Sequence, residues 1–314
     1  MQNAGMTTRG EKFLEISLQP LVDKHATVAN FAEIKGGLTA EQAMVLQSAT
    51  QGEGDRRKWF DGRAYFPLRF FVQSFGDGSG ELFRVLEKAR FSKKGASSGK
   101  VRLPFILNED LAYFLGVHAG DGCIPIHSPG VRGSWTVGIY EGYPEFHLEV
   151  CRPLIETLFG VTPAYNSKPR PDGRSNYYTA IHSAIAVNYL VECLGIRQGK
   201  KAGCVEVPKF VLNVDSPGIK AAFISGLFDT DGTVTGRDVR FSTVSKKLFE
   251  QVNFLLGELG LNTSFNTWLK AERYKLLYTI SIKSCSKSRF QEIIGFRHPL
   301  KKLKLEKILR SPVV

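Results

Sequence analysis

The sequence predicts an α+β protein made of two similar halves, preceded by a mainly helical extension. An apolar helical run that ends in aspartate and glycine occurs twice, as Phe114-Leu-Gly-Val-His-Ala-Gly-Asp-Gly122 and as Phe223-Ile-Ser-Gly-Leu-Phe-Asp-Thr-Asp-Gly232. Each copy is followed by the same succession of strand-like and helix-like segments. The aspartates of the two copies, Asp121 and Asp231, are 110 residues apart, and a motif duplicated at this distance indicates two related halves that face each other.

Composition limits the classes of function. The 314 residues are 43% hydrophobic and 23% charged, which is ordinary for a soluble globular protein. The formal net charge of +12 favours a polyanionic partner, nucleic acid before a membrane surface, over a merely basic protein. The sequence has neither a signal-peptide core nor an apolar run of about 20 residues, and its five scattered cysteines form no Cys-x-x-Cys. We therefore expect an intracellular, cytoplasmic protein.

Residues 1–100 predict a helical extension and a linker, with the two halves at 101–197 and 198–314. Helices are expected at 13–30, 39–48, 67–75 and 80–90, and a charged loop at 53–63. Thr39 and Gln42 have the spacing of a capping box. The short helices fit either a degenerate helix-turn-helix that adds DNA contacts or a small packing extension. The small, basic stretch 90–100 is the expected linker.

The first half predicts a helix over 109–119, capped by Asn108. A strand is expected at 134–140, where Trp135, Val137 and Ile139 share one side. A helix over 144–159, strands at 162–167 and 175–181, and a helix over 184–194 follow. The second half repeats the plan, with helices over 219–230, 245–259, 287–294 and 301–310 and strands at 238–243, 263–269 and 274–282. One further strand per half is expected near 123–126 and 233–235.

The residue types in the duplicated motif point to a cation site. Gly116 and Gly226 have no Cβ, so the two helices can approach closely. A carboxylate at a helix C-terminus is electrostatically unfavourable, and two carboxylates together repel each other. A sequence that does this twice, at Asp121 and Asp231, favours a bound cation, and oxygen ligands suit Mg²⁺. The glycine after each aspartate is expected to adopt a positive φ and turn the chain away.

Both motifs resemble the signature of the LAGLIDADG homing endonucleases in their single-chain, two-motif form. Leu103-Pro-Phe-Ile-Leu-Asn-Glu-Asp-Leu-Ala112 leads into the first motif as in that family, and Val207-Pro-Lys-Phe-Val-Leu212 leads into the second. Ile294-Gly-Phe296 closes the second half. The resemblance covers roughly residues 101–310. It implies two αββαββα repeats that form a DNA-binding saddle in a monomer.

The resemblance also implies a reaction and its residues. Asp121 and Asp231 would each hold a divalent metal, with the backbone of Gly120 and Thr230 beside it, and one site per strand would give a double-strand break with short 3′ overhangs. Lys283 falls where the family places a catalytic-pocket lysine. The matching position in the first half is His182, which departs from the usual lysine.

Two more residues in the motif helices are interpreted as structural. His118 is expected to pack at the helix interface, and Asp229 to be a helix-end polar group, because its counterpart is Ala119.

Each half is expected to turn one polar sheet face toward DNA. A two-stranded ribbon fits the major groove, where Arg and Lys can read guanine, while basic residues on turns hold phosphates. The candidate nucleic-acid-binding residues are Arg132, Lys168, Arg170, Arg174 and Tyr177 in the first half and Arg237, Arg240, Trp268, Lys270, Arg273 and Lys275 in the second.

Two other functions remain open at this stage, an intron RNA maturase of the same fold and a DNA-binding regulator that does not cleave. Retention of both aspartates favours the nuclease, because binding alone does not need two juxtaposed carboxylates. The chain starts at Met1 with neither a Cys nor a Ser splice start, so a complete intein is not expected.

Overall fold

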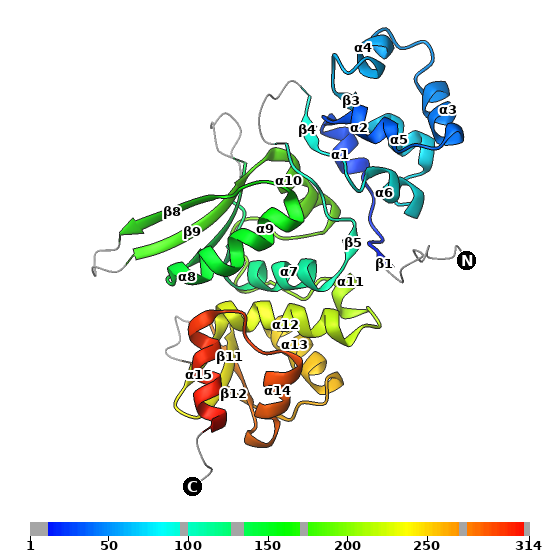
Figure 1. Cartoon of the computed structure of the whole chain (residues 1–314). Coiled ribbons are helices and arrows are strands. Elements are labelled where there is room, and N and C mark those ends of the chain that lie inside the picture. Colours follow the sequence, from blue (N-terminus) through cyan, green and yellow to red (C-terminus); the bar gives the residue numbers. More distant parts are fainter. Residues whose placement is uncertain (1–11, 95–99, 127–134, 170–174, 270–274, 311–314) are drawn as a thin grey trace.

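Two four-stranded antiparallel sheets with the same strand order form the body of the protein. They run β6-β7-β9-β8 and β10-β11-β13-β12, so the predicted α+β class with two sheet-containing repeats is confirmed (Figure 1). The computed structural model describes residues 12–94, 100–126, 135–169, 175–269 and 275–310. Five candidate DNA-binding residues lie outside the described residues: Arg132, Arg170, Arg174, Lys270 and Arg273.

The first repeat begins with the central helix and the short strand that was inferred after it. Its elements are α7 (Glu109–Asp121), β6 (Gly122–Cys123), β7 (Thr136–Glu141), α8 (Pro144–Phe146), the π-helical turn η1 (His147–Cys151), α9 (Arg152–Phe159), β8 (Ala164–Pro169), β9 (Ser175–His182), α10 (Ala184–Asn188) and the π-helical turn η2 (Tyr189–Cys193). The π-turns occur within two segments that the sequence predicts as single helices, 144–159 and 184–194.

The second repeat follows the same plan. Its elements are α11 (Lys209–Leu212), α12 (Pro217–Asp231), β10 (Gly232–Thr235), β11 (Asp238–Thr243), α13 (Lys246–Glu258), β12 (Thr263–Trp268), β13 (Leu277–Ile282), the short 3₁₀ turn η3 (Ser284–Ser286), α14 (Lys287–Ile293) and α15 (Pro299–Arg310). Strand β11 has the bounds that the alternation of Val239 and Phe241 with polar residues predicts.

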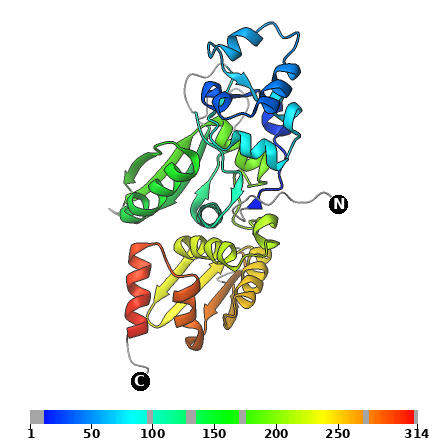
Figure 2. The same cartoon turned by 45° about the vertical axis from the view of Figure 1, so that its right-hand side comes forward.

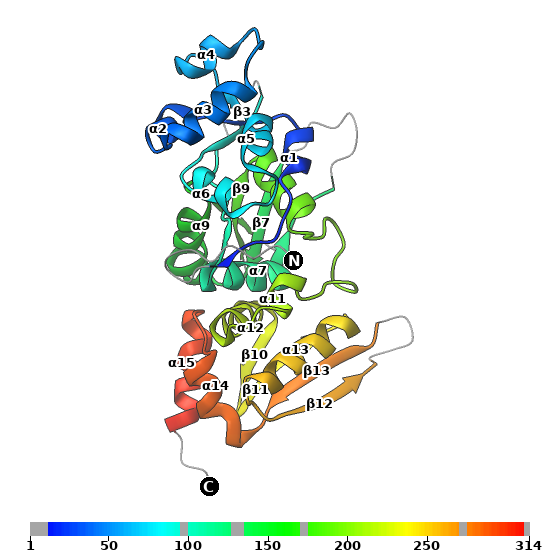
Figure 3. The ribbon, with the colours of Figure 1, turned by 90° about the vertical axis from the view of Figure 1, so that its right-hand side faces the viewer.

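Helices α7 and α12 pack side by side at the centre, between the two repeats (Figures 1 and 3). Asn108 and Ser216 begin them, because each side chain accepts a hydrogen bond from a backbone N–H one turn into its helix. The expected glycine contact is confirmed: a Cβ on Gly116 would lie 2.0 Å from the carbonyl oxygen of Phe223, and one on Gly226 would lie 2.2 Å from that of Tyr113. The two backbones therefore touch at both glycines.

Alternation along the strands gives each sheet one face on the helices and one open face. Val137, Ile139 and Ile181 are buried against the first repeat's helices, and Val239 and Phe241 against those of the second. The residues between them in sequence point the other way, onto the open face. The strand registers pair Gly122 with Ile139 and Gly232 with Phe241, so the two sheets begin at equivalent places beside the central helices.

The N-terminal unit packs on the first repeat, away from the second (Figure 2). It is mainly helical, and it also contains a small antiparallel sheet of order β3-β2-β4. Its elements are β1 (Lys12–Phe13), α1 (Gln19–Asp23), β2 (Ala26–Val28), α2 (Phe31–Gly36), α3 (Ala40–Ala49), α4 (Arg56–Phe60), β3 (Phe66–Pro67), α5 (Leu68–Phe75), α6 (Gly80–Leu86) and β4 (Phe91–Lys93), while β5 (Ile106–Leu107) pairs with β1.

Three sequence expectations for this unit are wrong. The expected linker at 90–100 contains β4, which pairs with β2. The single helix over 13–30 is instead a short helix between two short strands. Pro20 lies in the first turn of α1, because a proline cannot continue a helix from the residues before it. His25, just after α1, has a φ of 57° and so prevents the helix from continuing. The expected loop at 53–63 contains α4. The capping box of Thr39 and Gln42 is confirmed. The part of the chain that the structure describes has no helix long and apolar enough to cross a membrane.

Candidate active site

Two carboxylates meet where α7 and α12 end. Asp121 and Asp231 are the last residues of these helices, and each is only half-buried. Burial, together with the neighbouring carboxylates of Asp231 and Glu141, raises the pKa of Asp121 to about 7. Burial also raises the pKa of Asp231, against the opposing effect of Lys201 and Lys301. Each carboxylate is therefore held beside a like charge in a partly desolvated place.

This pair fits a divalent cation. Among the residues that the structure describes, none donates a hydrogen bond to either carboxylate, so their oxygens are free to bind a metal. No cluster of three or more His, Cys, Asp or Glu side chains that could hold a metal occurs within the same residues. A cation between Asp121 and Asp231 would thus take its remaining ligands from water and phosphate, as Mg²⁺ commonly does.

Two lysines close the ends of the central helices. The Nζ of Lys201 donates to the carbonyl oxygens of His118, Ala119 and Gly120 at 2.5, 2.5 and 2.6 Å. The Nζ of Lys301 does the same at the end of α12, donating to the carbonyls of residues 228, 229 and 230 at 3.1, 2.7 and 2.9 Å. Each ammonium satisfies three helix-terminal carbonyls and places a positive charge beside the carboxylates.

Sequence reasoning missed both lysines. A signal was present, since Lys201 and Lys301 occupy equivalent places shortly after the helices expected at 184–194 and 287–294. Burial lowers the pKa of Lys201 to about 8, while the two aspartates favour its charged form. Burial lowers the pKa of Lys301 as well.

The backbone around the aspartates differs from the expectation in two ways. The carbonyls of Gly120 and Thr230, predicted to lie beside a metal, accept hydrogen bonds from the two lysines. The prediction of a positive φ at Gly122 and Gly232 is wrong, because their φ angles are −74° and −80°. Glycine is needed at these positions because there is no space for a side chain. A Cβ on Gly232 would lie 2.3 Å from the carbonyl oxygen of Phe228.

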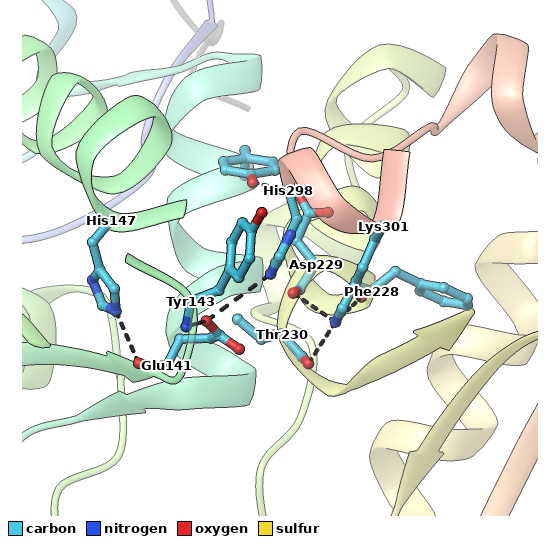
Figure 4. Close-up of polar contacts among 9 residues, drawn as sticks. Glu141, Tyr143, His147, Phe228, Asp229, Thr230, His298 and Lys301 are labelled. Carbon is cyan, nitrogen blue, oxygen red and sulfur yellow. Dashed lines mark hydrogen bonds and ion pairs between the residues drawn. The ribbon is translucent and has the colours of Figure 1, made fainter. Parts of the chain in front are cut away.

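A third carboxylate, that of Glu141, contributes to the raised pKa of Asp121. Glu141 belongs to a cluster that joins the two repeats (Figure 4). The Nε2 of His298, from the segment before α15, is 4.0 Å from a carboxylate oxygen of Glu141. The ring of His298 stacks on those of Tyr143 and Phe146, with centroids 5.1 and 4.8 Å apart. Lys301 lies one turn further along α15, so this cross-repeat contact fixes the start of the helix that carries it.

The other polar residues of the two motif helices are placed as structural groups. The Tyr113 hydroxyl of α7 donates to the buried carboxylate of Asp229 on α12, and the Arg297 backbone N–H donates to the same oxygen at 3.0 Å. Asp229 therefore joins the two helices, as its structural interpretation implies. His118 is 2% exposed, and burial lowers its pKa to about 3, so its ring packs in neutral form.

The structure does not bring His182 or Lys283 to the carboxylate pair. They do occupy equivalent places in the two sheets. His182 lies three positions beyond Thr179, which is level with Gly122. Lys283 lies three positions beyond Ile280, which is level with Gly232. Three residues of strand span about 10 Å. His182 contacts Thr136, with Nδ1 and Oγ1 3.1 Å apart, on the open face of the sheet. The basic groups next to the aspartates are Lys201 and Lys301.

The open faces contain most of the candidate DNA-binding residues that are described. Strand alternation places Lys168, Arg240 and Trp268 on the open faces, while Arg237 lies in the β10–β11 turn and Lys275 just before β13. Tyr177 was predicted on the wrong face. It is paired with Glu141 and stacks with Tyr165 on the side of the helices, at 6.2 Å between ring centroids.

Residues 218–295, which contain the second motif and its sheet, match the family model described as a LAGLIDADG-like domain. This chain carries a LAGLIDADG-like domain. The first repeat has the same strand order, and its helix contacts that of the second repeat through the equivalent glycine, so the LAGLIDADG-like arrangement occurs twice.

Curated relatives match over a small part of their own length. The chain is 29% identical over 205 residues to the replication factor C small subunit of Methanocaldococcus jannaschii, covering 65% of this chain and 10% of that protein. It is 29% identical over 207 residues to a DNA polymerase of Thermococcus sp. (strain GE8), covering 63% and 11%. One component of the A-type ATP synthase of Pyrococcus abyssi is 29% identical over 164 residues, covering 52% and 15%. The chain thus spans 10–15% of these three relatives.

Solved structures of homing endonucleases are also similar to this chain. The crystal structure of I-DmoI in complex with DNA and Ca is 20% identical, covers 64% of this chain and 98% of its own, and has a TM-score of 0.48. The homing endonuclease I-WcaI bound to its DNA recognition sequence is 14% identical, covers 72% and 93%, and has a TM-score of 0.43.

The raised pKa of Asp121 predicts how stability changes with pH. The folded carboxyl takes up a proton more readily than the unfolded one, whose pKa is 3.8. This contribution to stability is present below about pH 4 and is lost as the pH rises through about 7. At about pH 8 and without metal, Asp121→Asn is therefore expected to melt several degrees above the wild type, and at about pH 4 at nearly the same temperature.

Thermal melts in a chelating buffer at both pH values measure this difference. Adding millimolar Mg²⁺ at about pH 8 should raise the melting temperature of the wild type and leave that of Asp121→Asn almost unchanged. An equal shift in both proteins would place the metal away from Asp121.

Proposed function

We propose that this protein is a site-specific DNA endonuclease that uses divalent metal to cut both strands of a duplex. The observation that supports this most strongly is the two-fold arrangement at the centre. Two helix-end carboxylates, Asp121 and Asp231, lie together, and no residue in the described part of the chain donates a hydrogen bond to them. Each helix end is closed by a half-buried lysine. Binding alone does not need two juxtaposed, desolvated carboxylates, whereas a cation held at such a place would activate water and stabilise the leaving oxygen in phosphodiester hydrolysis.

Each residue type has a definite task in this proposal. The carboxylates of Asp121 and Asp231 would each hold a divalent cation against the scissile phosphate of one strand. A bound Mg²⁺ or similar ion lowers the pKa of its water and neutralises charge on the phosphate. Lys201 and Lys301 favour the ionised form of the two carboxylates, against the effect of burial, and would add positive charge beside the phosphate as the leaving oxygen develops its negative charge. Two such centres, one per strand, would give a double-strand break with short 3′ overhangs.

The open sheet faces supply the DNA-binding surface of the proposal. Both faces adjoin the central helices at equivalent positions, so one duplex can follow them from the first repeat to the second. Lys168, Arg240 and Trp268 lie on these faces, and the net charge of +12 favours phosphate contacts. Because one chain contains both carboxylates, we propose that it acts as a monomer, with residues 1–100 as an accessory unit.

The relatives support a self-contained activity. Their names describe a replication factor, a DNA polymerase and a component of an ATP synthase, yet the shared segment is 10–15% of each. We infer that the matched segment is a module separate from those named activities, and a nuclease that acts on specific DNA sites is consistent with such a module.

Selection from a random duplex library tests this function. The purified chain is incubated with a plasmid library that carries about 25 randomised base pairs, with Mg²⁺, and linearised molecules are sequenced at their ends. We expect one family of cut sites, with both strands broken a few nucleotides apart. Nicking without sequence preference, or no cutting in Mg²⁺ or Mn²⁺, would contradict the proposal.

The two lysines give a prediction about the individual strands. Lys201→Met and Lys301→Met are each expected to slow the cutting of one strand by at least tenfold, because each removes positive charge from one helix end. A supercoiled plasmid that contains the selected site should then accumulate as the nicked form. Strand-specific end labels show which strand is slow, and it should be the opposite strand in the two variants.

Lys283→Met serves as a matched control. Lys283 lies on the open face, about 10 Å along its strand from Ile280, the residue level with Gly232. If Lys283→Met produces the nicked intermediate and Lys201→Met does not, the basic group of the site is the one that the sequence predicts.

A further inference from the structure

One row of side chains on each open sheet face lies level with the aspartate of its own repeat. In the first repeat, Gly122 pairs with Ile139, so the next position along β7, Tyr140, is level with Asp121. Tyr140 pairs with Tyr178, which pairs with Asn166. We call these three residues the first central row.

The second central row occupies the same place in the second repeat. Gly232 pairs with Phe241, and the next residue, Ser242, pairs with Thr279, which pairs with Asn266. The two rows therefore share an asparagine at the outer end, Asn166 and Asn266. They differ only at the two inner positions.

The inner positions of the two rows have opposite chemistry. In the first row, the rings of Tyr140 and Tyr178 stack with centroids 5.5 Å apart and an angle of 24° between planes. Tyr140 is 43% exposed, and its ring lies over Gly138, where a Cβ would be 2.8 Å from the ring. In the second row, the hydroxyls of Ser242 and Thr279 bond to each other at 2.9 Å.

We propose that these rows make the protein read its two DNA half-sites differently next to the cleavage centre. The inference rests on the proposed endonuclease function. The stacked tyrosines present a broad apolar surface that suits the C5-methyl group of thymine in the major groove. The small hydroxyl pair can either donate or accept a hydrogen bond and so tolerates several bases. The half-site under the first repeat is thus selective for thymine at this step, and the mirrored position under the second repeat is not.

A similar pair of tyrosines elsewhere in the sheet provides a matched control. Tyr165 and Tyr177 also stack, at 6.2 Å between centroids, and they lie on the same two strands as the outer part of the first central row. Their face is turned to the helices, where His147 contacts both rings. They share the ring chemistry and differ in the face on which they lie.

Binding selection on a randomised duplex of about 25 base pairs tests the inference. Ca²⁺ replaces Mg²⁺ in the buffer so that bound duplexes are recovered, and sequencing gives the base preference at every position. We expect wild-type protein to enrich thymine about tenfold over the other bases at one near-central position, with no such preference at the mirrored position. In Tyr140→Ser/Tyr178→Thr, which copies the second row, the two positions should become alike and the thymine preference should disappear.

The reciprocal variant tests the same idea in the other repeat and does not depend on the stability of the first variant. Ser242→Tyr/Thr279→Tyr should create a thymine preference at the mirrored position. Tyr165→Phe/Tyr177→Phe should keep the wild-type preferences. A thymine preference that survives Tyr140→Ser/Tyr178→Thr, or symmetrical preferences in the wild type, would overturn the role of the rows while DNA recognition itself stands. If no sequence is enriched by the wild type, both this inference and the proposed function are overturned.

Discussion

Replacing either Asp121 or Asp231 with asparagine is expected to abolish double-strand cleavage and to leave DNA binding nearly intact. Asparagine has the shape of aspartate without its charge, so the close contact of α7 with α12 is kept while the cation loses an anionic ligand. A lost metal ligand costs orders of magnitude in rate, and phosphate contacts elsewhere on the two sheets maintain affinity. A time course of cleavage of the selected plasmid site, at several metal concentrations, measures the first effect. A gel-shift titration measures DNA binding.

Asp229→Asn is the matched comparison for these two variants. Asp229 lies two residues before Asp231 and is fully buried, where the Tyr113 hydroxyl and the Arg297 backbone N–H bind its carboxylate. Its replacement should lower thermal stability and leave the cleavage rate of the folded protein within a few-fold of the wild type. Full cutting by Asp121→Asn or by Asp231→Asn would show that the carboxylates at the helix ends are not the metal ligands.

Gly226→Ala, which adds one methyl group between the central helices, is expected to destabilise the fold strongly. The added carbon would lie 2.2 Å from the Tyr113 carbonyl oxygen and 2.8 Å from the Val117 backbone nitrogen. Neither backbone atom can move without separating the two central helices. We expect a loss of about 3 kcal/mol or more in unfolding free energy, at the upper end of overpacking effects, with loss of cleavage as the carboxylates move apart. Gly116→Ala should behave alike, from its contact with Phe223.

Gly257→Ala provides the opposite result from the same chemical change. Gly257 lies in α13, and a Cβ there would have no atom within 4 Å. Alanine should stabilise that helix by about 0.5–1 kcal/mol through its better helix propensity. Denaturant unfolding of the three variants compares them directly. Similar stabilities for Gly226→Ala and Gly257→Ala would contradict the close helix contact on which the site is built.

Much of the repeat architecture could be predicted because its signals are local. Strand β11 follows from the alternation of Val239 and Phe241, and α7 from the Asn108 cap and its apolar run. The N-terminal unit could not be predicted in the same way. Its strands have two or three residues, too few for a period, and they depend on contacts between distant parts of the chain. An example is the ring of Phe31 in α2, which stacks on that of Phe66 in β3 with centroids 4.1 Å apart.

The same distinction applies to the candidate site: residues within a local motif could be predicted, and residues brought in by folding could not. Asp121 and Asp231 stand inside a repeated motif, so the sequence points to them. Lys201 lies 80 positions beyond Asp121, in a segment without regular structure, and reaches α7 only through the folding of the chain between the repeats. Tyr177 and Tyr178 show that the sequence also does not decide which face of a strand a residue lies on. Both fit a strand, and one position in register decides which of them faces the helices and which faces outward.

The bond between Tyr113 and Asp229 also bears on the ancestry of the two halves. The glycine contacts make Tyr113 the counterpart of Phe223, and Asp229 the counterpart of Ala119. A homodimer of two second halves would place each Asp229 opposite a phenylalanine, burying two carboxylates without a hydroxyl donor. A homodimer of two first halves would leave each tyrosine hydroxyl facing alanine. Either half paired with itself would therefore lose this bond, and Tyr113 and Asp229 form a complementary pair that only the combination of the two halves provides.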